Sequence, residues 1–302
     1  MISGDISHHR EISNVRIGIV GAGRFGAAAI RTFGFQVSAI VSTRPHQVAG
    51  RFPDLNAVLV RTPEELPLQA FDLLWIAVPD SAIHEVVASL AGRSETWEGK
   101  IVLHASGATS LAALAPLKER GASTGVLHPN AILSGTEPLP PGLAWGVSLD
   151  GLTVEWADEF LSPVQPILIP VDDQERPLYH AAAALAANYS MTLFRSACRL
   201  YETVGVDADL AAGIVARFVR EGVRTSLERG VEDGLTGPVA RGDFSTVKGH
   251  LVAIRRAVPD LLPLMKELVR ATVLLVESNR LEEWESLLSS VNDHVESSDS
   301  GG

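Results

Sequence analysis

Two histidines and an asparagine are the side chains of this sequence best suited to acid–base chemistry. His180 and Asn188 lie eight positions apart in the segment Y-H-A-A-A-A-L-A-A-N. On an ideal α-helix they are about 80° apart around the axis and roughly 12 Å apart along it, so both could border one cleft. A histidine can donate a proton to a carbonyl oxygen that an asparagine amide holds, and His128, in L-H-P-N, is a second candidate donor. The alternative is that His180 and Asn188 satisfy backbone carbonyls where the helix enters the core.

A polar stretch in the last third of the chain, L-T-G-P-V-A-R-G-D, is a candidate for binding an acidic substrate. Its glycines and proline interrupt helix, so we expect a loop that displays Thr236, Arg241 and Asp243. The guanidinium of Arg241 can bind a carboxylate through two hydrogen bonds, and Ser106, in H-A-S-G, is a further candidate substrate contact. The alternative is that Asp243 caps the next helix and pairs with Arg241.

A glycine-rich turn predicts a cofactor site near the start of the chain. In V-R-I-G-I-V-G-A-G-R-F-G, residues 15–26, a β-branched run leads into G-x-G-x-x-G and a helical segment follows. The first glycine permits a tight turn, the second lets the backbone approach a pyrophosphate, and the third lets the helix pack closely on the strand. The sequence therefore predicts a dinucleotide site that is formed by Gly21, Ala22, Gly23, Arg24, Phe25 and Gly26.

The residues after the second predicted strand indicate which dinucleotide binds. Ser42, Thr43 and Arg44 follow that strand, where the cofactor ribose would lie. An NAD site usually has an acidic residue at this point, whereas an arginine accommodates the 2′-phosphate of NADP. The acid is missing and Arg44 is present, which favours NADP over NAD; the alternative is that Arg44 is an unengaged surface residue. Val78 and Pro79, after a later strand, complete the predicted cofactor site.

The first half of the chain alternates predicted strands and helices that would position these residues. Short apolar runs predict strands at residues 36–41, 57–60, 71–78, 101–104 and 123–127, with two more at 143–149 and 166–170 on the far edge. This pattern predicts a doubly wound α/β domain, with a mainly parallel sheet covered on both faces. Ligands of such sheets bind at the carboxyl ends of the strands, where V-P-D-S, H-A-S-G and L-H-P-N fall.

The second half is predicted to be all helical, because the strand pattern ends near residue 172. A long, mostly apolar helix is expected over 174–204, and further helices over 209–229, 244–257, 260–279 and 281–291. The predicted domains are therefore 14–171, which binds the cofactor, and 172–292, which is helical. A polar tail is expected at 1–13 and a disordered tail at 293–302.

Composition narrows the classes of function. The net charge of −11, without a basic stripe, argues against nucleic-acid binding, and no apolar run approaches the roughly 20 residues that span a membrane. One cysteine, Cys198, excludes an internal disulfide and a multi-thiolate zinc site, and its helical setting predicts a buried packing residue. The start of the chain lacks an apolar signal region, so a cytoplasmic protein without metal is expected.

The succession G-A-G-R-F-G, A-V-P-D, H-A-S-G, L-H-P-N, Y-H-A-A-A-A-L-A-A-N and L-T-G-P-V-A-R-G-D carries a family resemblance over residues 15–291. It resembles proteins, assigned as oxidoreductases, that couple a Rossmann-like domain to the domain of unknown function 2520. That family is similar to ketopantoate reductases, pyrroline-5-carboxylate reductases and hydroxyacid dehydrogenases. The resemblance implies a helical domain of the 6-phosphogluconate dehydrogenase C-terminal type, use of NADP or NAD, and a homodimer formed through that domain.

The resemblance also implies a reaction: NADP-dependent reduction of a small 2-oxo acid, with ketopantoate the leading candidate, at the boundary between the domains. Two alternatives stay open, reduction of a cyclic imine and a redox sensor that binds NADP without turnover. Many relatives have a catalytic lysine four residues before the helix asparagine, where this chain has Ala184. His180, one turn earlier, is then the expected proton donor, with His128 in reserve.

Overall fold

The computed structural model describes residues 14–276 and 280–291, and the chain divides into two compact units between Ala187 and Asn188. The predicted tails at 1–13 and 293–302 lie outside the described residues. The division falls later than the predicted domain boundary at 171/172, because the first turns of the long helix group with the sheet.

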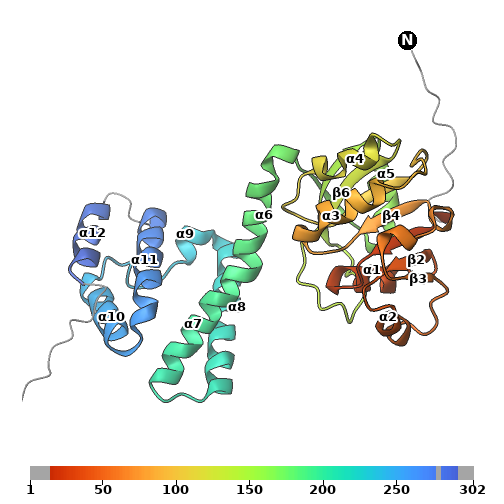
Figure 1. Cartoon of the computed structure of the whole chain (residues 1–302). Coiled ribbons are helices and arrows are strands. Elements are labelled where there is room, and N and C mark those ends of the chain that lie inside the picture. The colour runs from red at the N-terminus through yellow and green to blue at the C-terminus, as the bar shows by residue number, and fades with distance from the viewer. Residues whose placement is uncertain (1–13, 277–279, 292–302) are drawn as a thin grey trace, which may run out of the picture. The chain divides into compact units, whose positions relative to one another are not determined.

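The N-terminal unit is built on one eight-stranded sheet with the order β3-β2-β1-β4-β5-β6-β7-β8. Figure 1 labels β2, β3, β4 and β6 of this sheet. Strands β1 to β6 are parallel, as predicted, whereas β7 runs antiparallel to β6 and pairs in parallel with β8. The strands are β1 Ile17–Val20, β2 Val37–Val41, β3 Val58–Val60, β4 Leu73–Ile76, β5 Ile101–His104, β6 Ser123–Pro129, β7 Ala144–Asp150 and β8 Ile167–Pro170. The doubly wound α/β prediction is confirmed, including the two extra strands at the far edge.

Helices cover both faces of this sheet, and each face has its own hydrophobic core. In β4, Leu73 and Trp75 belong to one core while Leu74 and Ile76 belong to the other, which explains why the strand is a continuous apolar run. The first core packs α1 and α5 on the sheet, and the second packs α3 and α4. The helices of this unit are α1 Arg24–Phe33, α2 Pro45–Arg51, α3 Asp80–Ala91, α4 Ala115–Lys118, α5 Val154–Leu161 and α6 Arg176–Ala184.

The long helix predicted over 174–204 is present and contains a π-helical turn. Helix α6 continues into a π-helix, Leu185–Tyr189, and then into α7, Ser190–Thr203. In the C-terminal unit, Asp207 caps α8, Ala208–Arg229, by accepting hydrogen bonds from the N–H groups of Asp209 and Leu210 at 2.9 and 3.2 Å. The remaining helices are α9 Val231–Gly234, α10 Phe244–Ala257, α11 Leu262–Val276 and α12 Leu281–Ser289.

Two apolar clusters hold the C-terminal unit together. Cys198 of α7 packs with Ala211 and Val215 of α8, so the predicted packing role of the cysteine is confirmed. A larger cluster joins α10, α11 and α12 around the fully buried Trp284. Within the described residues, no helix combines the length and the apolar character needed to cross a membrane.

Candidate functional site

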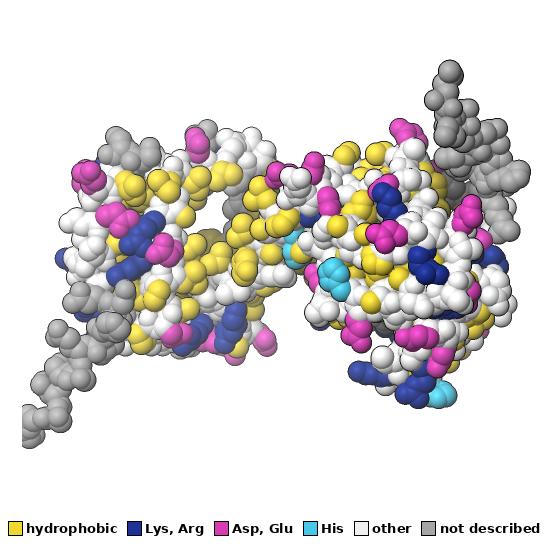
Figure 2. Space-filling view, turned by 45° about the horizontal axis from the view of Figure 1, so that its top comes forward, with side chains coloured by type: hydrophobic (Ala, Val, Ile, Leu, Met, Phe, Trp, Pro, Cys, Tyr) yellow, Lys and Arg dark blue, Asp and Glu magenta, His cyan; other side chains and the backbone are white. Residues whose placement is uncertain are grey.

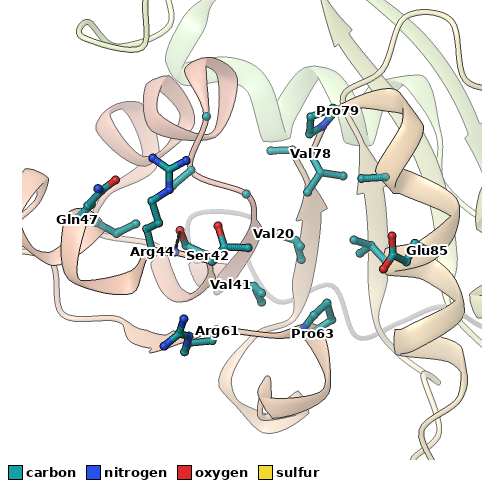
Figure 3. Close-up of a pocket in the computed structure, with 18 of the residues that line it drawn as sticks. Val20, Val41, Ser42, Arg44, Gln47, Arg61, Pro63, Val78, Pro79 and Glu85 are labelled. Carbon is teal, nitrogen blue, oxygen red and sulfur yellow. Dashed lines mark hydrogen bonds between the residues drawn. The ribbon is translucent and has the colours of Figure 1, made fainter.

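A pocket of about 670 Å³ lies at the carboxyl ends of β1, β2 and β4 (Figure 3). These parallel strands end at the same edge of the sheet, where nucleotides bind in doubly wound folds. Eight of the predicted cofactor residues line it: Gly21, Ala22, Gly23, Ser42, Thr43, Arg44, Val78 and Pro79. The pocket is therefore the candidate cofactor site.

The three glycines of the turn are required for different physical reasons. Gly21 has φ +100°, and a Cβ there would lie 2.6 Å from the carbonyl oxygen of Ala77. A Cβ on Gly26 would overlap the carbonyl oxygen of Gly21 and lie 3.4 Å from the Cβ of Ala77, so α1 could not approach β1. A Cβ on Gly23 would have no heavy atom within 4 Å, because this residue opens into the pocket.

We expect Gly26→Ala to lower the free energy of unfolding by about 1–3 kcal/mol, since the added methyl group overpacks the contact between α1 and the turn. Urea denaturation followed by tryptophan fluorescence measures the change. The control is Gly50→Ala in α2, where a Cβ has open space and alanine favours helix. An equal loss in both variants would contradict this explanation.

Two arginines lie on the outer wall of the pocket. The N–H of Ser42, after β2, donates to the carbonyl oxygen of Val60 at 3.0 Å, so Arg61, directly after β3, lies beside the predicted ribose segment. Figure 3 shows Arg44 and Arg61 on one side of the pocket and Glu85 on the other. Within the described part of the chain, no hydrogen bond or ion pair engages the guanidinium of Arg44 or Arg61.

The sequence did not identify four polar residues that also line this pocket, namely Gln47, Arg51, Arg61 and Glu85. Arg61 directly follows a predicted strand, which was the only sequence signal for it. That signal could not place Arg61 in the cofactor pocket without knowledge that β3 pairs with β2.

Three of the predicted cofactor residues do not line the pocket. The ring of Phe25 points into the core, where it packs edge-on to Trp75 and Trp145 with centroid distances of 5.0 and 6.4 Å. Gly26 is buried by the packing of α1, and Arg24 is exposed at the start of that helix. These three residues form the first turn of α1, and the pocket is lined by the residues before them and by those that follow β2 and β4.

A second group of polar side chains comes from the end of β6, the residue after it and α6, and we call it the histidine cluster: His128, Asn130, Tyr179 and His180. The Tyr179 hydroxyl lies 2.9 Å from Nδ1 of His128 and accepts a hydrogen bond from Nδ2 of Asn130 at 2.6 Å. The rings of His128 and His180 meet edge-on with their centroids 5.8 Å apart. The two histidines that the sequence proposed as donors therefore lie side by side.

The loop after β5 is fixed by a fully buried histidine. Nδ1 of His104 accepts from the N–H of Ser106 at 3.2 Å, and Nε2 lies 3.3 Å from the carbonyl oxygen of Ser110. Burial lowers the pKa of His104 to about 4, so the ring is neutral and Nε2 donates to that carbonyl. The Ser106 hydroxyl donates to Oγ1 of Thr109 and accepts from the Thr109 N–H, both at 2.9 Å, so its partners are within its own turn. Substrate binding by Ser106 stays a prediction.

A buried ion pair, which the sequence did not reveal, connects this loop to α6. The side chain of Arg176 is fully buried, and its Nε lies 3.4 Å from a carboxylate oxygen of Asp173. Arg176 also donates to the Ser148 hydroxyl of β7 at 2.7 Å. The Asp173 carboxylate accepts hydrogen bonds from the Ser110 hydroxyl and from the N–H of Leu111. The pair therefore ties the helix that carries Tyr179 and His180 to the end of the sheet.

In the predicted substrate loop of the C-terminal unit, the side chains of Arg241 and Asp243 form hydrogen bonds with groups of the loop itself and of the helix that follows it. Asp243 caps α10 by accepting from the N–H and the hydroxyl of Thr246 at 3.0 and 2.6 Å, which confirms the capping part of the alternative. The expected ion pair between Arg241 and Asp243 is wrong, because no such pair occurs among the described residues. The Arg241 guanidinium donates to the carbonyl oxygen of Thr236 in the same loop. Carboxylate binding by Arg241 and substrate binding by Thr236 and Asp243 stay predictions.

The predicted angle between His180 and Asn188 needs a correction. The estimate of about 80° assumed an ideal α-helix, but Asn188 lies within the π-helix Leu185–Tyr189. A π turn contains more residues than an α turn, so the side chains around it are rotated from their α-helical positions. Such turns are rare and often occur at functional sites.

No group of three or more His, Cys, Asp or Glu side chains in 14–276 and 280–291 is arranged to hold a metal ion.

Taken together, these observations define a two-domain protein with a dinucleotide-type pocket in a Rossmann-like domain and a helical second domain. Residues 1–129 match the Rossmann-like domain family, and residues 144–272 match the domain of unknown function 2520. The chain therefore combines a Rossmann-like domain with a domain of unknown function 2520, as its motifs predicted. No sequence among the curated proteins matches the chain.

Solved structures share this two-domain fold. A candidate NADP oxidoreductase from Bacteroides fragilis is 18% identical, with a TM-score of 0.71 over 86% of this chain and 98% of that one. A reductive aminase from Aspergillus terreus, in complex with NADPH and ethyl-5-oxohexanoate, is 20% identical, with a TM-score of 0.66 over 86% and 94%. Pyrroline carboxylate reductase from Plasmodium falciparum, with NADP bound, is 14% identical, with a TM-score of 0.55 over 91% and 98%. These likenesses establish the fold.

Proposed function

We propose that this protein is an NADP-dependent oxidoreductase that reduces a carbonyl or imine carbon of a small molecule. The observation that carries the proposal is the pocket at the carboxyl ends of β1, β2 and β4, with the Gly23 backbone open to it and Arg44 and Arg61 on its outer wall. A pyrophosphate suits the glycine turn and the N-terminus of α1, and a 2′-phosphate suits the guanidinium groups. The names of the three structural relatives, which include NADP or NADPH, support this cofactor.

The residues of the pocket suit three parts of NADP: the pyrophosphate, the phosphorylated ribose and the side that leads to the nicotinamide. Residues 21–23 would hold the pyrophosphate, Ser42, Thr43 and Arg44 the phosphorylated ribose, and Val78 and Pro79 the side that leads to the nicotinamide. No acidic residue follows β2 to bind a 2′-hydroxyl. Bound NADPH would supply the hydride.

We expect Arg44→Ala to weaken NADPH binding by about 10- to 100-fold, because a charge-assisted hydrogen bond to the 2′-phosphate contributes about 1.5–3 kcal/mol. NADH binding should stay within about twofold, since NADH lacks that phosphate and an exposed side chain contributes little else. Fluorescence titration of both nucleotides measures the two dissociation constants. Equal weakening for NADPH and NADH would contradict the proposed role of Arg44.

For the substrate, we propose a small 2-oxo acid of the ketopantoate type. His180 donates the proton, Asn188 orients the substrate oxygen, Arg241 binds the carboxylate, and His128 and Ser106 lie on the nicotinamide side. The adjacency of His128 and His180 at the carboxyl end of β6 supports acid–base chemistry at this edge of the sheet.

Reduction of an imine is the second candidate. It is favoured by two structural relatives, one named a reductive aminase and the other a pyrroline carboxylate reductase. An iminium ion is already protonated, so its reduction needs no acid donor, whereas a 2-oxo acid does.

One experiment separates these readings. The purified protein is mixed with NADPH or NADH and a panel of 2-oxo acids, including ketopantoate, and cyclic imines, and loss of reduced nicotinamide is followed. Turnover of an oxo acid supports the first candidate, and turnover of only imines supports the second. Tight NADPH binding without any turnover would favour a redox sensor, and failure to bind either nucleotide would overturn the proposal.

We propose that the protein forms a homodimer through its helical unit. Figure 2 shows hydrophobic side chains on the surface of this unit, and Phe218 on α8 is 68% exposed. Other exposed apolar residues of α7 and α8 are Met191, Leu193, Leu210, Val219, Val223 and Leu227. Burying such side chains contributes about 25 cal/mol per Å², which favours association.

Light scattering is therefore expected to give twice the chain mass of 32.2 kDa. Phe218→Glu should shift the protein toward the monomer, because it places a charge in the proposed interface. The control is Phe35→Glu, which changes an 84% exposed phenylalanine of the other unit and should leave the mass unchanged. A monomeric wild type would overturn this part of the proposal.

A further inference from the structure

We infer that Tyr179 and Asn130 are positioning residues that fix the proton of His128 on Nε2, so that His128 presents an N–H donor to the oxygen of the substrate. This inference rests on the proposed function, which it deepens by giving His128 a defined tautomer and a defined role. The two histidines of the cluster then have different roles. His180 donates a proton to the substrate, and His128 donates a hydrogen bond from a fixed N–H group.

The hydrogen bonds of the cluster have a direction that follows from Asn130. Its Nδ2, which can only donate, lies 2.6 Å from the Tyr179 hydroxyl and 3.4 Å from the carbonyl oxygen of Ala144. Because a carbonyl oxygen can only accept, the neighbour at Ala144 supports this orientation of the amide. The Tyr179 oxygen therefore accepts from Asn130.

The direction continues from Tyr179 to His128. The Tyr179 hydroxyl has one proton, and with Asn130 donating to its oxygen that proton is available for Nδ1 of His128, 2.9 Å away. A neutral imidazole whose Nδ1 accepts a hydrogen bond carries its proton on Nε2. A second contact fixes the tyrosine, since its ring tip packs directly on Gly146 of β7, where no side chain would fit.

The electrostatics of the cluster agree with two neutral groups. Burial, followed by the neighbouring His180 and Arg176, lowers the pKa of His128 to about 4, although Asp80 acts in the opposite direction. Burial also raises the pKa of the Tyr179 hydroxyl, so the tyrosine keeps its proton. At neutral pH the hydrogen bonds therefore join an uncharged tyrosine to an uncharged histidine.

The Nε2 edge of His128 is left open by Gly107, in the loop after β5. A Cβ at this position would lie 2.8 Å from Nε2 of His128 and 2.6 Å from Cδ2 of His180, between the two rings. The φ of Gly107 is not positive, so the need for glycine comes from this space and not from the backbone. Nε2 makes no hydrogen bond within the described residues, and His128 is only partly buried.

An N–H donor at this place has a clear chemical use. When a hydride adds to a carbonyl carbon, negative charge develops on the oxygen, and a fixed donor in a partly buried site stabilises that charge. A neutral histidine with a low pKa serves as such a donor, because it keeps its N–H while the charge is transferred. The tautomer matters, since an Nδ1–H histidine would present a lone pair to the oxygen.

The test is the tautomer itself, read by 15N NMR of the histidine-labelled full-length protein. We expect a protonated Nε2 and an unprotonated Nδ1 for His128 in the wild type. Asn130→Asp keeps the shape but replaces the donor by a carboxylate, which accepts the Tyr179 proton. Oη of Tyr179 must then accept from Nδ1, so the proton should move to Nδ1 or a second proton should bind. Tyr179→Phe should give a mixture of both tautomers.

Controls and contrary outcomes are specific. Tyr201→Phe changes a partly buried tyrosine of the other unit and should leave the His128 signals unchanged. Circular dichroism identifies any variant that fails to fold, and the wild-type spectrum alone then still decides the tautomer. A proton on Nδ1 in the wild type, or an unchanged tautomer in Asn130→Asp, would overturn the inference.

A kinetic measurement separates this inference from the proposed function. With an active substrate, Asn130→Asp should lower kcat by about 10²- to 10³-fold, the size of one lost oxyanion-type hydrogen bond. Tyr179→Phe should lower kcat only in proportion to the share of His128 that leaves the Nε2–H tautomer, and NADPH affinity should not change in either variant. A changed tautomer with unchanged kcat would overturn the role of His128 as donor. If no substrate is turned over, the proposed function fails while the NMR result still decides the tautomer.

Discussion

Asp173→Ala should lower the free energy of unfolding by about 3 kcal/mol, because it leaves the buried charge of Arg176 without its partner. The guanidinium keeps its charge at any accessible pH, so it cannot escape the cost by losing a proton. Breaking a buried pair costs about 3–5 kcal/mol, and the lower end applies since one third of the Asp173 side chain is exposed. The variant also removes the acceptor of the Ser110 hydroxyl and the Leu111 N–H.

Urea denaturation followed by tryptophan fluorescence measures this loss. The matched control is Asp150→Ala, which breaks the ion pair with Lys118, where the two side chains are 41% and 53% exposed. That surface pair should contribute less than about 1 kcal/mol. Similar losses in the two variants would contradict the importance of burial. A second change, Arg176→Met on the Asp173→Ala background, should restore part of the stability if the unpaired charge is the cause.

The same pair predicts how stability depends on pH. Burial acts to raise the pKa of Asp173, but hydrogen bonds from Ser110 and Leu111, together with Arg176, outweigh it and hold the pKa below the ordinary 3.8. A group whose pKa is lowered on folding stabilises the protein above its unfolded pKa and loses that contribution as the pH falls. The stability difference between wild type and Asp173→Ala should therefore be constant above about pH 5 and shrink below about pH 4.

Much of the N-terminal fold was predictable because local chemistry determines it. The glycine turn, the short apolar runs and the polar residues at their ends predicted strand positions and the edge at which ligands bind. The pairing of strands is not local, and this explains why Arg61 was missed: it enters the pocket only because β3 pairs with β2. Phe25 was placed in the cofactor site because it lies inside the motif, whereas its ring faces the core.

The histidine cluster and the buried ion pair could be predicted only in part. His128 and His180 were identified by their chemistry, but Tyr179 meets residues 49 and 51 positions earlier in the chain, and no local pattern encodes that contact. Arg176 and Asp173 look like ordinary exposed residues at the start of a helix, and only the packing of α6 against the sheet buries the arginine. The π turn likewise has no signal in a run of alanines.

His180→Ala should lower the turnover of a 2-oxo acid with NADPH by about 10²- to 10⁴-fold, since general acid catalysis contributes a factor of this size. NADPH affinity should not change, because His180 does not line the cofactor pocket. Steady-state assays at saturating substrate and fluorescence titration of NADPH measure the two quantities. The control is His84→Ala, which removes an exposed histidine of α3 and should leave both unchanged. Unchanged turnover in His180→Ala would eliminate its role as the donor.

The same variant can distinguish between the two candidate substrates when both classes are assayed. The oxygen of a 2-oxo acid gains charge during reduction and needs both the proton of His180 and the hydrogen bond of His128, so His180→Ala and Tyr179→Phe should each reduce its turnover. A cyclic iminium ion has no such oxygen and is already protonated, so its reduction should be insensitive to both changes. If His180→Ala lowers the turnover of the 2-oxo acid but not that of the imine, His180 is the proton donor, and a 2-oxo acid is favoured as the substrate class. If neither His180→Ala nor Tyr179→Phe lowers the turnover of any substrate, imine reduction is favoured, because that reaction needs neither a proton donor nor a hydrogen bond to an oxygen.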